Sequence, residues 1–190
     1  MTLASPTLPT NRLWTVEEYH HMVDVGIILP DERVELIEGE IVSMAAKKPP
    51  HVIVTELAAE YLRQLLASTA HIRTQDPIVL DERNEPEPDI AVVMPPLRRY
   101  LDHHPTSHEI FLIIEVADAT LKFDTEKKAA TYAKSAIADY WVIDASAHQV
   151  HVFRAPVNGA YTNHVILNKF SSIRPLAFPE ITVIVQEFFP

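Results

Sequence analysis

Cysteine is absent from this chain of 190 residues, and glycine occurs only three times. Without cysteine the protein has no disulfide, no thiolate zinc site and no cysteine nucleophile, which fits a reducing cytosol. So few glycines argue against the glycine-rich loops that cradle nucleotide phosphates. No serine lies in a nucleophile-elbow motif, and the HExxH zinc motif is missing. The sequence therefore excludes several familiar classes of active site.

Long hydrophobic runs and an excess of basic residues are also lacking. The longest apolar runs, such as IFLII, are too short to cross a bilayer. The first residues, MTLASPTLPTN, lack the basic start and apolar core of a signal peptide, so we expect a cytoplasmic protein. The formal net charge of -10 disfavours simple coating of nucleic acid, which needs a basic surface. It does not exclude an enzyme that reaches nucleic acid through a metal ion.

The apolar share of 47% is typical of a globular protein, and the length fits one domain. We expect residues 1–11 to form a flexible tail and residues 12–190 to form a single domain. The sequence contains no internal repeat or low-complexity segment.

The N-terminal part of the domain carries a helix signal and a hairpin signal. TVEEYHHMVDVG predicts a helix, because Thr15 and Glu18 match a capping box and Gly26 lies where a helix would stop. In RVELIEGEIVSM two apolar runs flank Glu38-Gly39, which predicts a β-hairpin with a tight turn.

Two further helices are predicted. In HVIVTELAAEYLRQLLAS (51–68) the apolar residues fall near helical spacing. TEKKAATYAKSAIA (125–138) is predicted as a helix capped by Asp124 or Thr125. With Tyr132 at its edge, its inward face would consist of Ala129, Ala133, Ala136 and Ile137.

The other apolar segments predict strands. They are 71–80, 90–94, 109–116 and, later in the chain, YWVID, VHVFRAP, AYTNHVIL and ITVIVQEFF. The order of helices and strands indicates a mixed α/β domain with one central sheet covered by helices.

Two acids adjoin apolar strands. Asp89 opens the strand IAVVM, and Glu115 nearly closes the following strand, EIFLIIEV. If these strands pair antiparallel, both carboxylates meet at one end of the sheet. Neighbouring carboxylates repel, so one must bind a proton or both must share a cation, and oxygen ligands suit Mg²⁺ or Mn²⁺. Asp89 could also be a turn or cap residue, whereas an acid inside a buried strand is rarely without a partner.

A lysine beside a metal-bound water can orient it and offset charge on the attacked phosphate. Lys127 and Lys128 occur early in the predicted helix 125–138. Lys128 lies one turn before Tyr132, so these two side chains can be neighbours. Either lysine could instead be solvated, as helix lysines usually are.

Histidines give weaker signals. His103, His104 and His108 lie in a polar loop with no fixed spacing, so solvated loop histidines are the better interpretation. His20 and His21 are adjacent on the first predicted helix, so they do not face one site together.

PEPDIAVV, IIEVADATL and DTEKKAATYAKSAIADYWVID together resemble the Uma2 branch of the PD-(D/E)XK nuclease superfamily, which is described as a group of restriction-type endonucleases. The resemblance spans nearly the whole chain. It implies a restriction-endonuclease-like fold, a mixed central sheet flanked by helices with an N-terminal helix and hairpin. It also implies that Asp89 and Glu115 are metal ligands and that Lys128 supplies the catalytic lysine. Ala117 occupies the position two residues after the acid, where the wider superfamily has that lysine.

The resemblance adds three further candidates. Glu35, in VELIEG, could be another acid of the site or an exposed strand residue. His51 could carry a proton near neutral pH or have a local hydrogen-bonding role at the start of its helix. Gln75 could contact the metal-bound water or the substrate, or satisfy a strand edge.

The sequence thus predicts a Mg²⁺-dependent (or Mn²⁺-dependent) endonuclease that hydrolyses phosphodiester bonds in DNA. Cutting both strands of a duplex favours two sites related by a two-fold axis, so we expect a homodimer. Two alternatives stay open. One is a catalytically inactive binding or assembly module that retains the fold, which the acidic composition favours. The other is phosphodiester chemistry on RNA or a small nucleotide.

Overall fold

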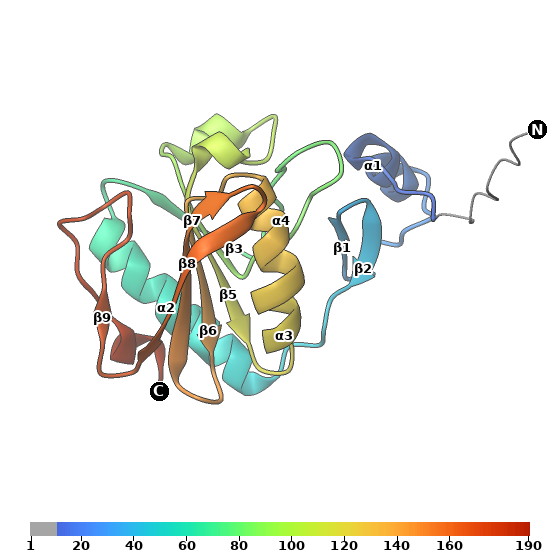
Figure 1. Cartoon of the computed structure of the whole chain (residues 1–190). Coiled ribbons are helices and arrows are strands. Elements are labelled where there is room, and N and C mark those ends of the chain that lie inside the picture. The colour runs from blue at the N-terminus through green and yellow to red at the C-terminus, as the bar shows by residue number, and fades with distance from the viewer. Residues whose placement is uncertain (1–10) are drawn as a thin grey trace, which may run out of the picture.

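The computed structural model of the protein describes residues 11–190 (Figure 1). A six-stranded sheet with the strand order β3-β4-β5-β6-β7-β8 forms its centre. Strands β5 and β6 pair parallel, and the other neighbours in this sheet pair antiparallel. The strands are β1 (Val34–Ile37), β2 (Glu40–Ser43), β3 (His71–Thr74), β4 (Ile90–Val93), β5 (Ile110–Ala117), β6 (Asp139–Asp144), β7 (Gln149–Val157), β8 (Ala160–Asn168), β9 (Ser172–Ile173) and β10 (Val183–Ile184).

Helices cover both faces of the sheet, as the sequence predicted. They are α1 (Val16–Asp24), α2 (Pro49–Leu66), α3 (Leu121–Phe123), α4 (Ala129–Lys134), the π-helical turn η3 (Asp124–Lys128), and the short 3₁₀ turns η1 (Leu97–Tyr100), η2 (Ser107–Glu109) and η4 (Val185–Phe188). Figure 1 shows α2 on one side of the sheet and the continuous segment α3–η3–α4 on the other. That segment connects the parallel strands β5 and β6, which need such a crossover.

The sheet separates two apolar clusters. Leu62 and Leu66 of α2 pack with Ile114 of β5 and with the C-terminal segment in one cluster. Tyr132 of α4 packs with Tyr140 of β6 in the other. Burial of these side chains is the main driving force for the fold.

The N-terminal helix and hairpin form as predicted. Thr15 and Glu18 make the capping box of α1, and Gly26 follows the helix with a φ of +74°. Strands β1 and β2 pair antiparallel around Glu38 and Gly39, whose φ values of 54° and 75° suit a tight hairpin turn. Backbone hydrogen bonds between Leu36 and Glu85 attach this hairpin to the loop that leads to β4.

Two predicted strands are shorter than expected. The strand predicted at 71–80 ends at Thr74, because Gln75 has a φ of 55° and turns the chain out of the extended region. ITVIVQEFF forms only the two-residue strand β10, which continues into η4. Its residues Val183, Val185 and Phe188 are still buried, so the apolar pattern reflected core packing rather than a long strand.

The helix predicted at 125–138 is displaced toward the N-terminus. Helical structure begins at Leu121 and ends at Lys134, so Asp124 lies inside it and is not its N-cap. Ala136 has a φ of 58° and an exposed side chain, whereas Tyr132, predicted at the edge, is fully buried. The spacing of apolar residues did not reveal that the turn before α4, η3, is π-helical.

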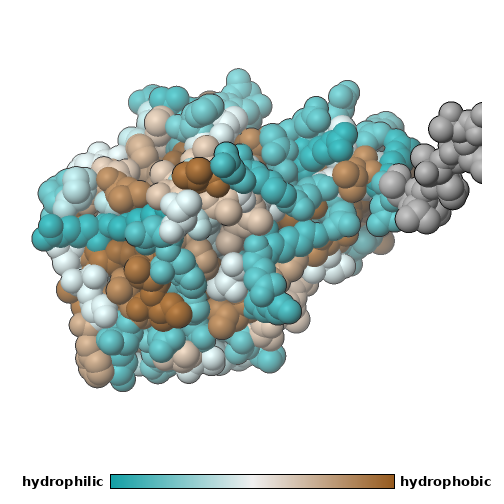
Figure 2. Space-filling view, in the orientation of Figure 1, coloured by the Kyte–Doolittle hydropathy of each residue, from teal (hydrophilic) through white to brown (hydrophobic). Residues whose placement is uncertain are grey.

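Strand β8 is an outer strand of the sheet and pairs only with β7. Val165 and Ile166 on it are about half exposed. Figure 2 shows hydrophobic surface in the region of β8, while hydrophilic residues cover much of the remaining view. Among residues 11–190, no helix is long and apolar enough to cross a membrane. The predicted N-terminal tail lies almost entirely outside the described residues.

Candidate active site

Asp89 and Glu115 lie together at one end of the β4–β5 pair. Ile90 pairs with Ile114, so the antiparallel register sets Asp89 opposite Glu115, as predicted. The backbone N–H of Asp89 donates to Oε2 of Glu115 at 3.3 Å, and the N–H of Val116 donates to Oδ2 of Asp89 at 2.9 Å. Each acid is therefore fixed by the strand that carries the other, and both side chains are buried.

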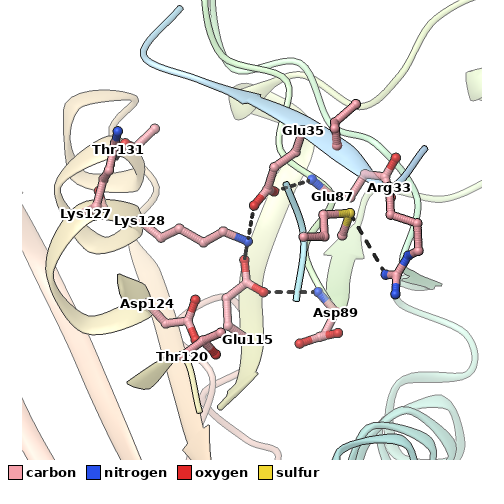
Figure 3. Close-up of polar contacts among 12 residues, drawn as sticks. Arg33, Glu35, Glu87, Asp89, Glu115, Thr120, Asp124, Lys127, Lys128 and Thr131 are labelled. Atoms are coloured by element: carbon pink, nitrogen blue, oxygen red, sulfur yellow. Dashed lines mark hydrogen bonds and ion pairs between the residues drawn. The ribbon is translucent and has the colours of Figure 1, made fainter. Parts of the chain in front are cut away.

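Lys128 points from η3 into this pair of strands (Figure 3). Its Nζ lies 2.9 Å from Oε1 of Glu115 and 3.1 Å from Oε1 of Glu35. The backbone N–H of Ala129 bonds to the carbonyl of Asp124, the five-residue spacing of a π-helical turn. This turn directs both Asp124 and Lys128 inward, where each is buried.

Glu35 joins the site from the hairpin. Its Oε1 contacts the ammonium of Lys128, and its Oε2 accepts a hydrogen bond from the backbone N–H of Glu87 at 3.1 Å. Glu35 is only 3% exposed, so it is a buried member of the network and not an exposed strand residue.

His51 and Gln75 both contact Asp89. Nε2 of His51, in the first turn of α2, lies 3.1 Å from Oδ2 of Asp89. Nε2 of Gln75 donates to Oδ1 of the same carboxylate at 3.2 Å. The positive φ of Gln75, which ends β3, brings its backbone N–H against the carbonyls of Pro88 and Asp89.

Two members of the site were not identified from the sequence. The hydroxyl of Tyr132 donates to Oε1 of Glu115 at 2.7 Å. Asp124, considered only as a helix cap, is buried near Lys128 and accepts a hydrogen bond from the hydroxyl of Thr120 at 2.6 Å. The spacing of Lys128 and Tyr132, one turn apart, was the available signal for the tyrosine.

The two central acids have pKa values shifted in opposite directions. Burial alone would raise the pKa of Asp89, but the hydrogen bond and charge of His51, the Val116 N–H and Lys128 lower it below its ordinary value. For Glu115 burial dominates and raises the pKa to about 8, reinforced by Asp89 and opposed by Lys128. Asp89 is thus the acid held ionised, and Glu115 is the acid whose charge is costly.

The carboxylates also determine the state of Lys128. Burial alone would lower the pKa of this lysine, but Glu115, Glu35 and Asp124 outweigh burial and raise it. Burial raises the pKa of Asp124 to about 6, against the opposing effects of Lys128 and Thr120. The ammonium of Lys128 is therefore a fixed positive charge among several acids.

A cleft of about 260 Å³ opens beside this network and is lined by Glu35, His51, Asp89, Glu115 and Lys128. Within residues 11–190, no group of three or more histidine or acidic side chains is arranged to hold a metal ion. The residues that would hold a metal ion here are the carboxylates of Asp89 and Glu115, which adjoin at the end of the β4–β5 pair. One or two carboxylates completed by water and substrate phosphate suit Mg²⁺, so the residues fit that ion.

The other sequence candidates lie elsewhere. Lys127 pairs with Glu40 at the surface, outside the network of Lys128. His103 lies 2.9 Å from Asp102 in its loop. Nε2 of His20 on α1 lies 2.7 Å from Oε2 of Glu85. The site thus comprises residues from α2, β1, β5, η3, α4 and the chain beside β3 and β4.

Comparison with known proteins agrees with this architecture. A family model named Uma2 and described as "Putative restriction endonuclease" matches residues 16–186. A crystal structure from Anabaena variabilis ATCC 29413, of a "putative nuclease belonging to DUF820", is similar with a TM-score of 0.68 and 16% sequence identity. The similarity covers 87% of this chain and 96% of that chain, and at this identity it shows the fold. None of the curated proteins matches the chain. The family match spans nearly all of the domain, and the chain belongs to the Uma2 family.

Proposed function

We propose that this protein is a metal-dependent endonuclease that hydrolyses phosphodiester bonds in DNA. The observation that carries the proposal is the convergence of Asp89, Glu115 and Lys128 on one cleft, from a loop end, a strand and a helical turn. Family membership supports a nuclease as the class of enzyme. The proposal includes a homodimer, because two sites related by a two-fold axis suit the two strands of a duplex.

Asp89 and Glu115 would hold Mg²⁺ or Mn²⁺. When bound, the ion would lower the pKa of a water molecule and stabilise charge on the attacked phosphate. The protein's contribution is a pair of ligands held in place, since the backbone N–H groups of Asp89 and Val116 donate to the two carboxylates before any ion binds.

Lys128 would supply the positive charge that faces the substrate phosphate. Its ammonium stays protonated because Glu35 and Glu115 lie at 3.1 and 2.9 Å. A fixed cation in a partly enclosed cleft stabilises a developing negative charge better than a solvated one. The hydroxyl of Tyr132 shares Oε1 of Glu115 with the ammonium and so keeps that carboxylate in place.

His51 would move or hold a proton at the edge of the site. Its Nε2 contacts Asp89, while its Nδ1 is buried and has no hydrogen-bond partner among residues 11–190. A buried polar atom without a partner is costly, so this nitrogen is suited to a water molecule or a substrate oxygen. Gln75 would position Asp89 through its amide.

Plasmid cleavage with Mg²⁺ or Mn²⁺ tests the proposal. Asp89→Asn and Glu115→Gln preserve side-chain volume but remove the ligand charge, so both should lose nicking and linearisation at every metal concentration. Glu126→Gln is the matched control, because Glu126 is exposed on η3 and makes no ion pair within residues 11–190. Cleavage that persists in both ligand variants would overturn the assignment of the site. If wild-type protein binds DNA but never cleaves plasmid, the result supports the non-catalytic binding module.

A further inference from the structure

Three cations line the mouth of the cleft, although the chain as a whole is acidic. They are Arg33, directly before β1, and Lys47 and Lys48, just before α2. All three line the same hollow as Asp89 and Glu115. Basic side chains beside a carboxylate pair would bring phosphate groups to the metal ligands.

Lys48 already has a partner, whereas Arg33 and Lys47 do not. Nζ of Lys48 lies 3.5 Å from Oδ2 of Asp118 across the cleft mouth. Within residues 11–190, neither Arg33 nor Lys47 makes an ion pair, and the guanidinium of Arg33 reaches only Sδ of Met44 at 3.9 Å. Figure 3 shows the Arg33 side chain near Glu87, without a dashed contact between them.

Arg33 and Lys47 are also close enough to repel each other. The pKa of Lys47 is lowered, first by burial and then by the charge of Arg33, while Asp89 and Glu87 oppose the shift. Two neighbouring cations that form no ion pair repel each other, and an anion bound between them would relieve this repulsion. Glu87 lines the same cleft, and the charges of Arg33 and Lys47 lower its pKa against the larger raising effects of burial and Glu35. Within residues 11–190, however, Glu87 forms no ion pair with either cation. Asp89 and Glu115 already contact His51 and Lys128.

We propose that Arg33 and Lys47 form an anion-binding subsite that takes a DNA backbone phosphate next to the phosphate to be cut. This inference rests on the proposed function and names two positioning residues for its substrate. The guanidinium can donate two hydrogen bonds to phosphate oxygens, and the ammonium adds a point charge. The pair fixes how the strand lies along the cleft, and it reads no base.

DNA binding without catalysis tests the subsite directly. A Glu115→Gln background in EDTA removes one carboxylate and any metal-dependent cleavage. In this background, Arg33→Gln and Lys47→Gln are added singly, and fluorescence anisotropy measures the Kd for a short labelled DNA duplex across a salt series. Each substitution should weaken binding roughly tenfold at low salt. Each should also reduce the slope of log K against log salt by about 0.9, the value for one phosphate contact.

Two controls separate this subsite from general charge. Arg98 is exposed like Arg33, and Lys169 is half-buried like Lys47. Neither lines the cleft, and neither makes an ion pair within residues 11–190. Arg98→Gln and Lys169→Gln remove the same net charge, so they should leave the salt slope unchanged.

The outcomes distinguish this inference from the proposed function. If Arg33→Gln and Lys47→Gln bind with the Kd and salt slope of the control variants, the subsite is wrong, even if wild-type protein cleaves plasmid. Absence of DNA binding at low salt would also overturn it. If both lose affinity and slope while no wild-type cleavage is ever observed, the subsite stands and the endonuclease proposal fails.

Discussion

The two faces of β5 differ sharply in chemistry. On the α2 side, Ile114 and Val116 pack into a continuous apolar cluster. On the α3–α4 side, Glu115 lies between them in sequence and contacts Lys128 and Tyr132. One face of β5 is therefore stabilised by the burial of apolar side chains, whereas the other face buries charged side chains. Only the second face has chemical groups that can act on a substrate, and it needs every charge to be paired.

The largest expected effect comes from removing the central cation. Lys128→Met keeps the volume but leaves Glu35 and Glu115 buried without their partner. Breaking a buried ion pair in this way should lower the free energy of unfolding by about 3–5 kcal/mol, measured by urea denaturation. Lys127→Met is the control, because its surface pair with Glu40 should contribute less than about 1 kcal/mol. Equal effects of the two variants would contradict the buried network.

A truncation on the opposite face should affect stability without affecting the site. Ile114→Ala leaves a cavity against α2 and should cost about 2–5 kcal/mol of unfolding free energy. Because Ile114 faces away from the carboxylates, the affinity of the folded variant for Mn²⁺ should stay at the wild-type value, as measured by calorimetry. A loss of Mn²⁺ affinity similar to that of Asp89→Asn would show that the two faces are not independent.

The pH dependence of stability should come from the charged face. The pKa of Glu115 rises from 4.5 to about 8 on folding, so the folded state holds the proton more tightly between these values. The free energy of unfolding should therefore fall as the pH rises through this window, by at most about 1.4 kcal/mol for each pH unit. Urea denaturation in EDTA at several pH values measures it.

Glu115→Gln is the matched variant for this titration. It has no ionisable group at position 115, so its stability should change less between pH 5 and pH 8, values near the ends of the window. A Glu115→Gln curve that falls as steeply as the wild-type curve would assign the pH dependence to other groups, such as Asp124, whose pKa rises to about 6.

The smallest expected effect is loss of the tyrosine hydroxyl. Tyr132→Phe removes the 2.7 Å hydrogen bond to Glu115 but preserves the ring packing against Tyr140. Above pH 8, where Glu115 is ionised, the cost should be about 1.5 kcal/mol of unfolding free energy, the low end for hydrogen bonds to charged groups. Tyr61→Phe is a control of the same chemistry on the α2 side, where the hydroxyl only accepts a bond from the Ile184 N–H. If Tyr61→Phe costs as much, the charge on Glu115 does not strengthen its bond.

Much of this contrast could be predicted from the sequence, because strand periodicity and burial are local properties. Asp89 and Glu115 were placed together by one assumption, antiparallel pairing, and the register of β4 and β5 confirms it. Asp124 or Thr125 was predicted as the cap, because both residue types favour the N-cap position. The π-helical turn brings Asp124 inward, and such a turn has no signature in apolar periodicity.

Long-range contacts account for the remaining differences. The burial of Glu35 depends on the hairpin docking against the loop at Glu85, some fifty residues later, and no local pattern in VELIEG specifies that contact. In ITVIVQEFF, Val183, Val185 and Phe188 are buried in the cluster that includes α2, although most of the segment is not in a strand. For Val183, Val185 and Phe188, local pattern thus predicted burial correctly although it predicted the wrong backbone conformation.

Two hydrogen bonds, from the Asp89 N–H to Glu115 and from the Val116 N–H to Asp89, connect the ends of β4 and β5 and depend on their register. A slip of β4 by one residue would break both hydrogen bonds and turn Asp89 toward the apolar cluster on the α2 side, away from Lys128. A chain with this register would bury the Asp89 carboxylate among apolar side chains, which is energetically costly. The two acids that we propose as metal ligands would therefore also favour the correct pairing register of β4 and β5.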